Sequence, residues 1–361
     1  MKRTLAILLA LLLLLCACGT QAAPETTQRE STESVTEQTE EISTTAAEAA
    51  ETRAALSWSK AFRSKKMPEG ELHMDEAAFY SVDDAGKITI VNVAKEEILT
   101  DMTENPFPRS HHYEQFMTEE GLAILPYLDY AMSYGYSRIC VPTTEFHGGS
   151  VAAGAVELNR MYRTNNGGLT GLSATTVQEG DTAYDCVLIC VQGLEKPNAV
   201  KYHLEGLQAA KKVVEEMPKD LSEYDRALYL YRYLTENVRY HYDDYYKQDW
   251  YLCYDALVEG KTVCAGYTEA LYYLYNLAGI ECITQEGVIA GEGPEAWHIW
   301  NVARVDGSWY LFDSTWDEGL PASYYNFFGI SDETMQSYAV RHIIAYDVEH
   351  CPPCTETLPH P

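Results

Sequence analysis

The segment PEAWHIWNVARVDGSWYLFDSTWDEG, from Pro294 to Gly319, decides the fold of the C-terminal half of this chain. Alternation of side chains predicts one strand over 297–305 and a second over 308–315. Between them, Asp306-Gly307 is a strong signal for a two-residue hairpin turn. The segment therefore predicts an antiparallel hairpin whose register is set by the turn.

This register brings a histidine and a carboxylate together. Counting outward from the turn puts His298 opposite Thr315 and Asp313 opposite Trp300. Opposite residues, and residues two apart on one strand, point to the same face, so His298 and Asp313 are diagonal neighbours within hydrogen-bonding reach. A shift of one residue would separate them. A carboxylate that fixes the tautomer of a histidine prepares that histidine to take a proton from a thiol.

A thiol comes earlier in the chain. Apolar residues at helical spacing predict a helix over 265–278 that stops at Gly279. Cys264 lies at its start, where unpaired N–H groups and the helix dipole stabilise a thiolate. Gly266 is expected to leave room for a substrate near the backbone. The alternative for Cys264 is a buried, inert cysteine. With His298 it would form a nucleophile–base pair, although periodicity does not show that the two meet.

The motifs VCAGYTEALYYLYNLAGIECITQEGVIAG, HIWNV and DGSWYLFDSTWDEG resemble the bacterial transglutaminase-like superfamily over about 221–329, under a third of the chain. Thr268 and Ile299 depart from the alanine common there. The resemblance implies an α+β, papain-like core: a helix with the cysteine, packed on an antiparallel sheet with the histidine and the aspartate. It implies that Cys264 is the nucleophile, His298 the general base and acid, and Asp313 the orienting carboxylate.

The implied chemistry is acyl transfer at peptide or protein amide bonds through a thioester. Water as acceptor gives a protease or amidase, and an amine gives a crosslinking transglutaminase. We favour hydrolysis, because water is always present and the sequence shows no amine site. The oxyanion needs donors, for which the backbone N–H of Cys264 and the side chain of Tyr254 are candidates. The alternative is a non-catalytic binding or scaffolding module, against which the complete triad argues.

The start of the chain predicts its location. The apolar run Leu5–Leu15 is too short to span a bilayer as a permanent helix. It ends in LCACG, 15–19, which resembles the lipobox of bacterial lipoproteins. That resemblance implies cleavage before Cys18 and a lipid on its sulfur, whereas the alternative is an ordinary secretory signal. We expect an exported protein, anchored to the outer face of the bacterial cytoplasmic membrane.

Charge and composition limit the partners. Residues 20–55 are rich in Thr, Glu, Ser and Ala, which predicts a disordered tether. Acidic residues outnumber basic ones 54 to 26, for a net charge of −28. This argues against nucleic acid and against adsorption to anionic lipid. The expected partners are therefore a peptide or protein substrate at the cell envelope, and the membrane through the lipid anchor.

The expected domains are a signal peptide over 1–17, a tether over 18–55, an N-terminal α+β region over 56–195, a transglutaminase-like catalytic domain over 196–345 and a tail over 346–361. The N-terminal region is expected to hold strands over 87–93, 137–143, 171–177 and 184–194. Its expected helices are 113–135, kinked or split by Pro126, and 148–166. Two further helices are expected over 198–217 and 222–240, the second capped by Ser222 and Asp225.

The remaining polar motifs predict no metal and no cofactor. Beyond Cys18 and Cys264 an odd number of cysteines is left, so at least one more is a free thiol. Cys351-Pro-Pro-Cys354 has no matching second pair, which favours a small disulfide or free thiols over a zinc site.

The other histidines, such as His111 and His112, are expected to be isolated surface residues without ligand spacing. Asn301 is expected to be a structural hydrogen-bonding residue, because it points away from His298. The four tryptophans of the hairpin region are expected in the core and around the site: Trp297, Trp300, Trp309 and Trp316.

Overall fold

The computed structural model describes residues 75–82, 88–142, 158, 161–162, 169–179, 182–191, 194, 198–241, 252–290, 297–338, 340–344 and 350–361. All of them belong to one compact unit of the chain. The expected signal peptide, the lipidated Cys18 and the tether lie outside the described residues, and so does most of the helix expected over 148–166.

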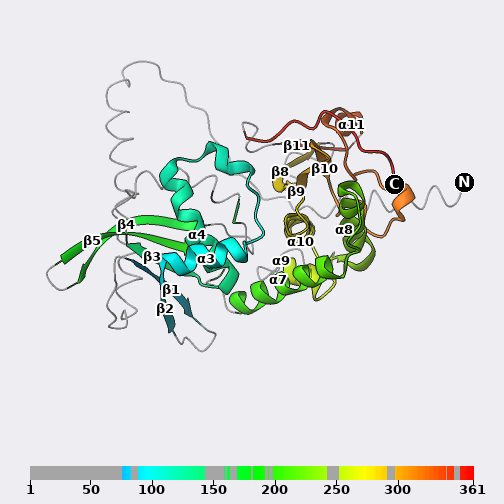
Figure 1. Ribbon diagram of the computed structural model, residues 1–361. Coiled ribbons are helices and arrows are strands. Elements are labelled where there is room, and N and C mark those ends of the chain that lie inside the picture. Colours follow the sequence, from blue (N-terminus) through cyan, green and yellow to red (C-terminus); the bar gives the residue numbers. More distant parts are fainter. Residues whose placement is uncertain are drawn as a thin grey trace, which may run out of the picture. The chain divides into compact units, whose positions relative to one another are not determined.

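The N-terminal region contains a five-stranded antiparallel sheet in the order β2-β1-β3-β5-β4 (Figure 1). The four expected strands are confirmed, and the structure adds a fifth, β1. Their bounds are β1 Glu76–Val82, β2 Ile88–Ala94, β3 Arg138–Pro142, β4 Leu169–Glu179 and β5 Thr182–Val191.

Two helices accompany this sheet, α3 (Lys95–Glu104) and α4 (Glu119–Tyr134), and they pack on each other and on β2 and β3. A short 3-10 helix, η1 (His112–Phe116), precedes α4. Thr118 caps α4 with its side chain, and Gly135 ends it in the left-handed region at φ 74°. The expected helix over 113–135 therefore begins later than expected, and Pro126 lies inside α4 without splitting it.

Three helices of the second half match their expected positions, and the structure adds a short fourth one. The three are α7 (Ala199–Glu216), α8 (Glu223–Asn237) and α10 (Cys264–Leu277), and the added one is α9 (Leu252–Leu257). The hydroxyl of Ser222 accepts from the backbone N–H of Asp225, which confirms the expected cap of α8. Two short parallel strands, β6 (Arg239–Tyr240) and β7 (Lys261–Thr262), lead into α10.

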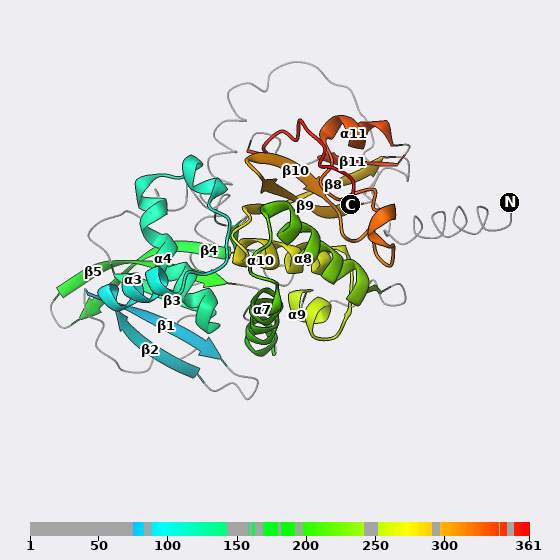
Figure 2. The same cartoon turned by 45° about the vertical axis from the view of Figure 1, so that its right-hand side comes forward.

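Helix α10 is the central element of this half (Figure 2). Every residue from Cys264 to Tyr275 is buried. The helix contacts α7, α8 and α9 on some sides and strands β8 and β9 on another. Two of its tyrosines end in hydrogen bonds within the protein: the hydroxyl of Tyr272 donates to the carbonyl of Met161 at 2.9 Å, and that of Tyr275 to the carbonyl of Ala227 at 3.0 Å. Several helices and strands together therefore bury α10, including its first turn, which carries Cys264.

A four-stranded antiparallel sheet in the order β10-β9-β8-β11 covers α10. Its strands are β8 (Cys282–Ala290), β9 (Trp297–Val305), β10 (Ser308–Phe312) and β11 (Arg341–Ile344). Between β10 and β11 the chain forms η3 (Ala322–Tyr324) and α11 (Asp332–Ser337). The α+β class, with helices and antiparallel sheets, is confirmed, whereas the expected domain boundaries stay predictions.

The hairpin of β9 and β10 has the expected register, with Val305 paired to Ser308. Asp306 and Gly307 both have positive φ, 50° and 91°, as a type I′ turn requires. The second strand ends at Phe312 and not at 315, so the expectation of a strand through Thr315 was wrong. The reason is a bond to a later segment: the backbone N–H of Asp313 donates to the carbonyl of Phe327, so the chain has left the ladder with β9.

Among the described helices, none combines the length and the apolar character that crossing a membrane requires.

Candidate active site

Cys264 is the first residue of α10, as expected. The residue before it, Val263, has extended backbone and gives the helix no side-chain cap. The first N–H groups of a helix have no partner within it, so this end can stabilise a negative charge. Cys264 itself is buried, with 1 % of its surface exposed. A substrate carbonyl can reach the sulfur only if neighbouring groups move aside.

Gly266 has a different role from the expected one. A Cβ atom built on Gly266 would lie 1.9 Å from Oγ1 of Thr262 and 2.8 Å from its Cβ. The glycine therefore lets the end of β7 approach the first turn of α10, and the space beside it is filled by Thr262. The expectation that Gly266 makes room for a substrate was wrong.

His298 and Asp313 meet as the hairpin register predicts. Nε2 of His298 lies 2.6 Å from Oδ2 of Asp313, and both side chains are buried. The thiol of Cys264 is close enough to His298 to contribute to the raised pKa of this histidine. Since Nε2 faces Asp313, Nδ1 is the ring nitrogen left for the sulfur. The structure thus brings together the three residues expected to form the triad, while their catalytic roles stay a prediction.

Asp313 is held by its own backbone surroundings. Its Oδ1 accepts the backbone N–H groups of Thr315 at 3.0 Å and Trp316 at 3.3 Å. The hydroxyl of Tyr231 lies 2.8 Å from both the carbonyl of Asp313 and a carboxylate oxygen of Asp317. Asp317 in turn accepts the backbone N–H groups of Asn326 and Phe327, so the whole loop after β10 is tied down. The carboxylate of Asp313 is therefore fixed before it contacts His298.

The electrostatics favour a charged pair. Burial alone would lower the pKa of His298, but the negative charge and hydrogen bond of Asp313, with a smaller contribution from Cys264, outweigh it and raise the pKa to about 10. Burial alone would raise the pKa of Asp313, but His298 and a second histidine lower it below its usual value. His298 is thus an imidazolium at neutral pH, paired with an ionised carboxylate.

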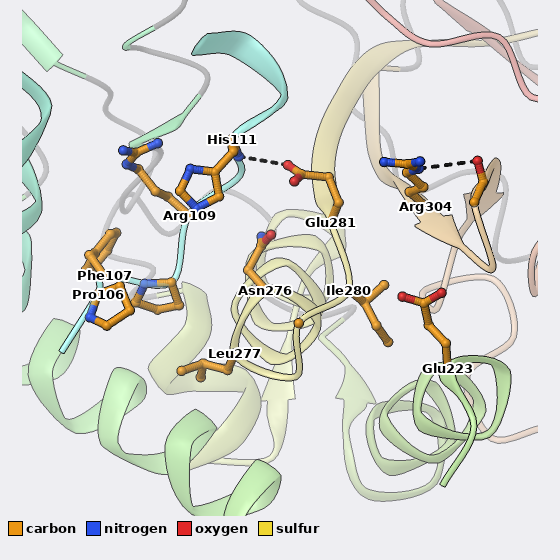
Figure 3. A pocket seen from close by; sticks show the side chains of 13 residues that line it. Pro106, Phe107, Arg109, His111, Glu223, Asn276, Leu277, Ile280, Glu281 and Arg304 are labelled. Carbon is orange, nitrogen blue, oxygen red and sulfur yellow. Dashed lines mark hydrogen bonds between the residues drawn. The ribbon is translucent and has the colours of Figure 1, made fainter. Parts of the chain in front are cut away.

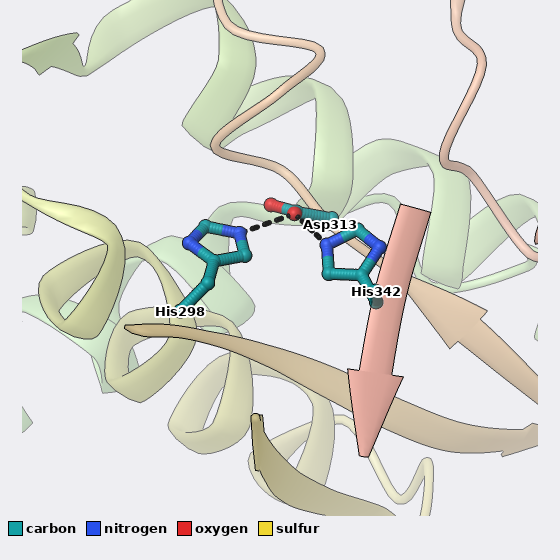
Figure 4. A group of neighbouring side chains, drawn as sticks. All are labelled: His298, Asp313 and His342. Carbon is teal, nitrogen blue, oxygen red and sulfur yellow. Dashed lines mark hydrogen bonds and ion pairs between the residues drawn. The ribbon is translucent and has the colours of Figure 1, made fainter. Parts of the chain in front are cut away.

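The second histidine is His342 on β11, which was not expected at the site (Figure 4). Its Nε2 lies 2.7 Å from the same Oδ2 of Asp313. The general expectation that the remaining histidines are isolated surface residues was wrong here, because only 3 % of His342 is exposed. No local motif could have revealed it, since its partners are 29 and 44 residues away and β11 pairs with β8, which lies about fifty residues earlier.

Aromatic rings wall this cluster. Trp316 stacks on His298 with ring centroids 5.4 Å apart and lies 4.5 Å from the ring of His342. Trp300 contacts both imidazoles from β9. The expectation of tryptophans around the site holds for these two, which exclude water and strengthen the charged contacts.

Helix α10 is fastened to β9 on the other face of the sheet. The amide of Asn301 donates to the carbonyl of Thr268, and the hydroxyl of Thr268 donates to the carbonyl of Ile299. Asn301 is the structural residue it was expected to be. These two bonds fix the distance between the helix that carries Cys264 and the strand that carries His298.

Tyr254, the expected oxyanion donor, is engaged elsewhere. Its hydroxyl donates to Glu259 at 2.9 Å, and its ring lies against Tyr202. Its role stays a prediction without a contact to support it. The cysteines of the described part whose side chains are characterised are all free thiols, among them Cys351 and Cys354. The open alternative for that pair is thus resolved in favour of thiols.

A cavity of about 560 Å³ lies at the opposite end of α10 (Figure 3). It is lined by Asn276 and Leu277 of that end, by Phe107 and by Arg304, and by none of the triad residues. At its edge the carboxylate of Glu281 accepts backbone N–H groups from the start of η1. This cavity is separate from the candidate active site.

Within the described part of the chain, His298, Asp313 and His342 form a group whose nitrogen and oxygen atoms lie within 4.8 Å of one another and could hold a metal. The two N···O distances, 2.6 and 2.7 Å, are those of hydrogen bonds. Ligand atoms around a tetrahedral zinc ion are about 3.3 Å apart. The arrangement therefore fits protons between the groups better than a metal ion.

Residues 210–314 match the family model of the Transglutaminase-like superfamily, so this part of the chain is a transglutaminase-like domain. The matched range includes Cys264, His298 and Asp313. Kyphoscoliosis peptidase from Homo sapiens is 36 % identical over 74 residues, which cover 18 % of this chain and 11 % of that protein. The Mus musculus protein is 35 % identical over 74 residues, with the same coverage. The chain thus spans about a tenth of the length of these relatives.

Two solved structures are similar at a low level. A TGase has 17 % identity and a TM-score of 0.28, with 52 % of each chain covered. The periplasmic domain of TgpA from Pseudomonas aeruginosa, bound to ethylmercury, has 13 % identity and a TM-score of 0.25, with 50 % of this chain and 72 % of that chain covered. Values this low do not bear on the reaction.

The raised pKa of His298 predicts how stability depends on pH. A histidine whose pKa is about 10 when folded and about 6.5 when unfolded contributes stability that is complete below pH 6.5 and is lost as the pH rises towards 10. We expect the free energy of unfolding of wild type to exceed that of His298→Gln by a few kcal/mol at pH 6. Urea titrations at pH 6 to 10 should show this difference shrinking steadily.

The control is His360→Gln, at an exposed histidine, which should follow wild type at every pH. A difference between wild type and His298→Gln that stayed constant from pH 6 to 10 would show that His298 does not hold an extra proton in the folded state.

Proposed function

Starting from the transglutaminase-like domain at residues 210–314, we propose that the protein is a cysteine acyl-transfer enzyme that acts on amide bonds of peptides or proteins. The observation that carries this proposal is the position of His298, which is hydrogen-bonded to Asp313 on one side and close to the thiol of Cys264 on the other. Three side chains from α10, β9 and the end of β10 converge in the order nucleophile, base and orienting carboxylate.

The reaction begins from a negatively charged Cys264 and a positively charged His298. The imidazolium of His298 supports a thiolate on Cys264, and this thiolate attacks the carbonyl carbon of the amide. The carbonyl oxygen becomes an oxyanion, for which the backbone N–H of Cys264 at the start of α10 is the best-placed donor. His298 then gives its proton to the leaving amine, and the C–N bond breaks. The product is a thioester on Cys264, with His298 neutral.

The acceptor completes the cycle. His298 takes a proton from water or from an amine, which attacks the thioester and releases the thiolate of Cys264. Asp313 keeps the imidazole in one orientation through both steps and balances the charge that forms on it. Water gives hydrolysis, which we favour, because it needs no binding site of its own. Protein crosslinking through an amine is the second candidate, and a module that binds without turnover is the third.

Reactivity of Cys264 tests the enzyme proposal. We expect iodoacetamide at pH 7 to modify Cys264 at least about tenfold faster than Cys351, a half-buried free thiol that serves as the internal reference. Burial raises the pKa of Cys253 and Cys282 well above the usual value, so these thiols should react slowly. Peptide mapping by mass spectrometry gives each rate.

His298→Gln should reduce the rate at Cys264 and leave Cys351 unchanged, because the imidazolium that is removed lies beside Cys264. If Cys264 reacts no faster than Cys351 in the native protein, the enzyme proposal fails and the binding module becomes the better account.

The acyl acceptor is tested with a casein-like protein and a fluorescent primary amine. We expect fragments of the protein without incorporated label, since hydrolysis is favoured, and no fragments with Cys264→Ala. Label incorporation that depends on Cys264 would instead support crosslinking. Gel electrophoresis with fluorescence detection separates the two results.

We also propose that the protein is exported and held at the outer face of a bacterial cytoplasmic membrane by a lipid on Cys18, because residues 15–19 have a lipobox-like sequence. The wild-type protein expressed in bacteria should sediment with membranes, and Cys18→Ser should not. A wild-type protein found in the soluble fraction would contradict the anchor but would leave the acyl-transfer proposal intact.

A further inference from the structure

His342 is a buried imidazole that the reaction as described does not use. It lies on β11, outside the hairpin, and reaches the same oxygen of Asp313 that accepts from His298. The two imidazole rings are 5.2 Å apart, with planes inclined by 30°. A single carboxylate oxygen therefore lies between two histidines, and each of them contacts it through Nε2 (Figure 4).

The surroundings of His342 define its protonation state. Its Nδ1 lies 3.2 Å from the sulfur of Met335, a weak acceptor, whereas Nε2 lies 2.7 Å from a carboxylate. The ring proton therefore belongs on Nε2. Burial, with a smaller contribution from the charge of His298, lowers the pKa of His342, so it stays neutral at pH 7 although Asp313 acts in the other direction.

The titratable groups that face His342 are Asp313 and His298, and its other described ring contacts are the sulfur of Met335 and three aromatic rings. The aromatic rings are those of Trp300 on β9 and of Trp316 and Phe327 in the segment after β10. Only 3 % of the surface of His342 is exposed at this position. A buried acceptor that loses a donor here would stay short of one.

We propose that His342 is a positioning residue that acts through Asp313: its neutral Nε2–H gives Oδ2 a second donor and holds the carboxylate in the plane that His298 needs. This deepens the proposed function and rests on it. Oδ2 then accepts from the two imidazoles, and Oδ1 accepts from the N–H groups of Thr315 and Trp316. These four hydrogen bonds leave the carboxylate no freedom to rotate.

The shared oxygen has an electronic consequence as well. A donor on Oδ2 draws negative charge away from His298 and so weakens the hold of Asp313 on the imidazolium proton. This makes it easier for His298 to give that proton to the leaving amine. Without His342 the carboxylate would bind the imidazolium more strongly but would be less well oriented.

Two substitutions separate this role from simple filling of space. His342→Gln keeps an N–H donor at nearly the same reach, whereas His342→Leu fills the volume and removes the donor. We expect His342→Leu to reduce the rate of alkylation at Cys264 about tenfold, the order of one hydrogen bond to a charged group. His342→Gln should stay close to wild type, and Cys351 should be unaffected in both.

The second measurement is the titration of His298 by NMR of protein labelled with ¹⁵N-histidine. It is made in a Cys264→Ala background, because the thiol helps to raise the pKa of His298 and its removal brings the midpoint lower. We expect His342→Leu to move this midpoint to higher pH and His342→Gln to leave it near that of the background. The spectrum of His342 should show a neutral ring protonated on Nε2.

Circular dichroism melts establish that each variant is folded. If folded His342→Leu and His342→Gln lower alkylation equally and leave the midpoint of His298 unchanged, His342 only fills space and the proposal is wrong. If both alkylate like wild type, it is wrong too. If Cys264 is unreactive in wild type, the proposed function fails, whereas the titration still decides whether His342 acts on Asp313.

Discussion

A carboxylate that is removed from water must be matched by donors, and Asp313 shows how this requirement organises the site. Its two oxygens receive two imidazoles and two backbone N–H groups. The backbone donors follow Asp313 directly in the chain, so they cost no long-range arrangement. The imidazoles come from β9 and β11, which must both lie in the sheet for the charge to be satisfied. The buried ion pair with His298 is therefore satisfied only when β9 and β11 both take their places in the sheet.

The distance between sulfur and imidazole depends on a different set of contacts. Helix α10 is bound to β9 by hydrogen bonds from Thr268 and Asn301, and its first turn is packed against β7 at Gly266. None of these groups takes part in the proposed chemistry. They set the distance between α10, which carries Cys264, and β9, which carries His298. A small change in the distance between two reacting groups can slow a reaction greatly.

Much of this site could be predicted from the sequence, because the decisive interactions are local or periodic. The Asp306-Gly307 turn fixes the register by backbone conformation alone, and helical spacing with a glycine stop places Cys264 at a helix start. What failed was the end of β10, where the backbone N–H of Asp313 bonds to the carbonyl of Phe327 and its side chain accepts the N–H groups of Thr315 and Trp316. That choice between ladder and turn is not visible in residue alternation.

His342 escaped prediction for another reason. Its position depends on β11 joining the edge of the sheet beside β8. The two strands are about fifty residues apart in the chain, and a strand of four residues has too little pattern to predict such a pairing. For Tyr254, nearness in sequence to Cys264 suggested a role that stays a prediction, and in the structure its hydroxyl donates to Glu259 within its own segment.

Helix α10 is buried along nearly its whole length and is covered on several sides. Amide hydrogens in such an element exchange with solvent only when much of the domain unfolds. The backbone under Cys264 is thus among the slowest-moving parts of the protein. Whatever motion admits a substrate to the sulfur must then belong to the coverings of α10, and the rate at which those coverings open sets an upper limit on turnover.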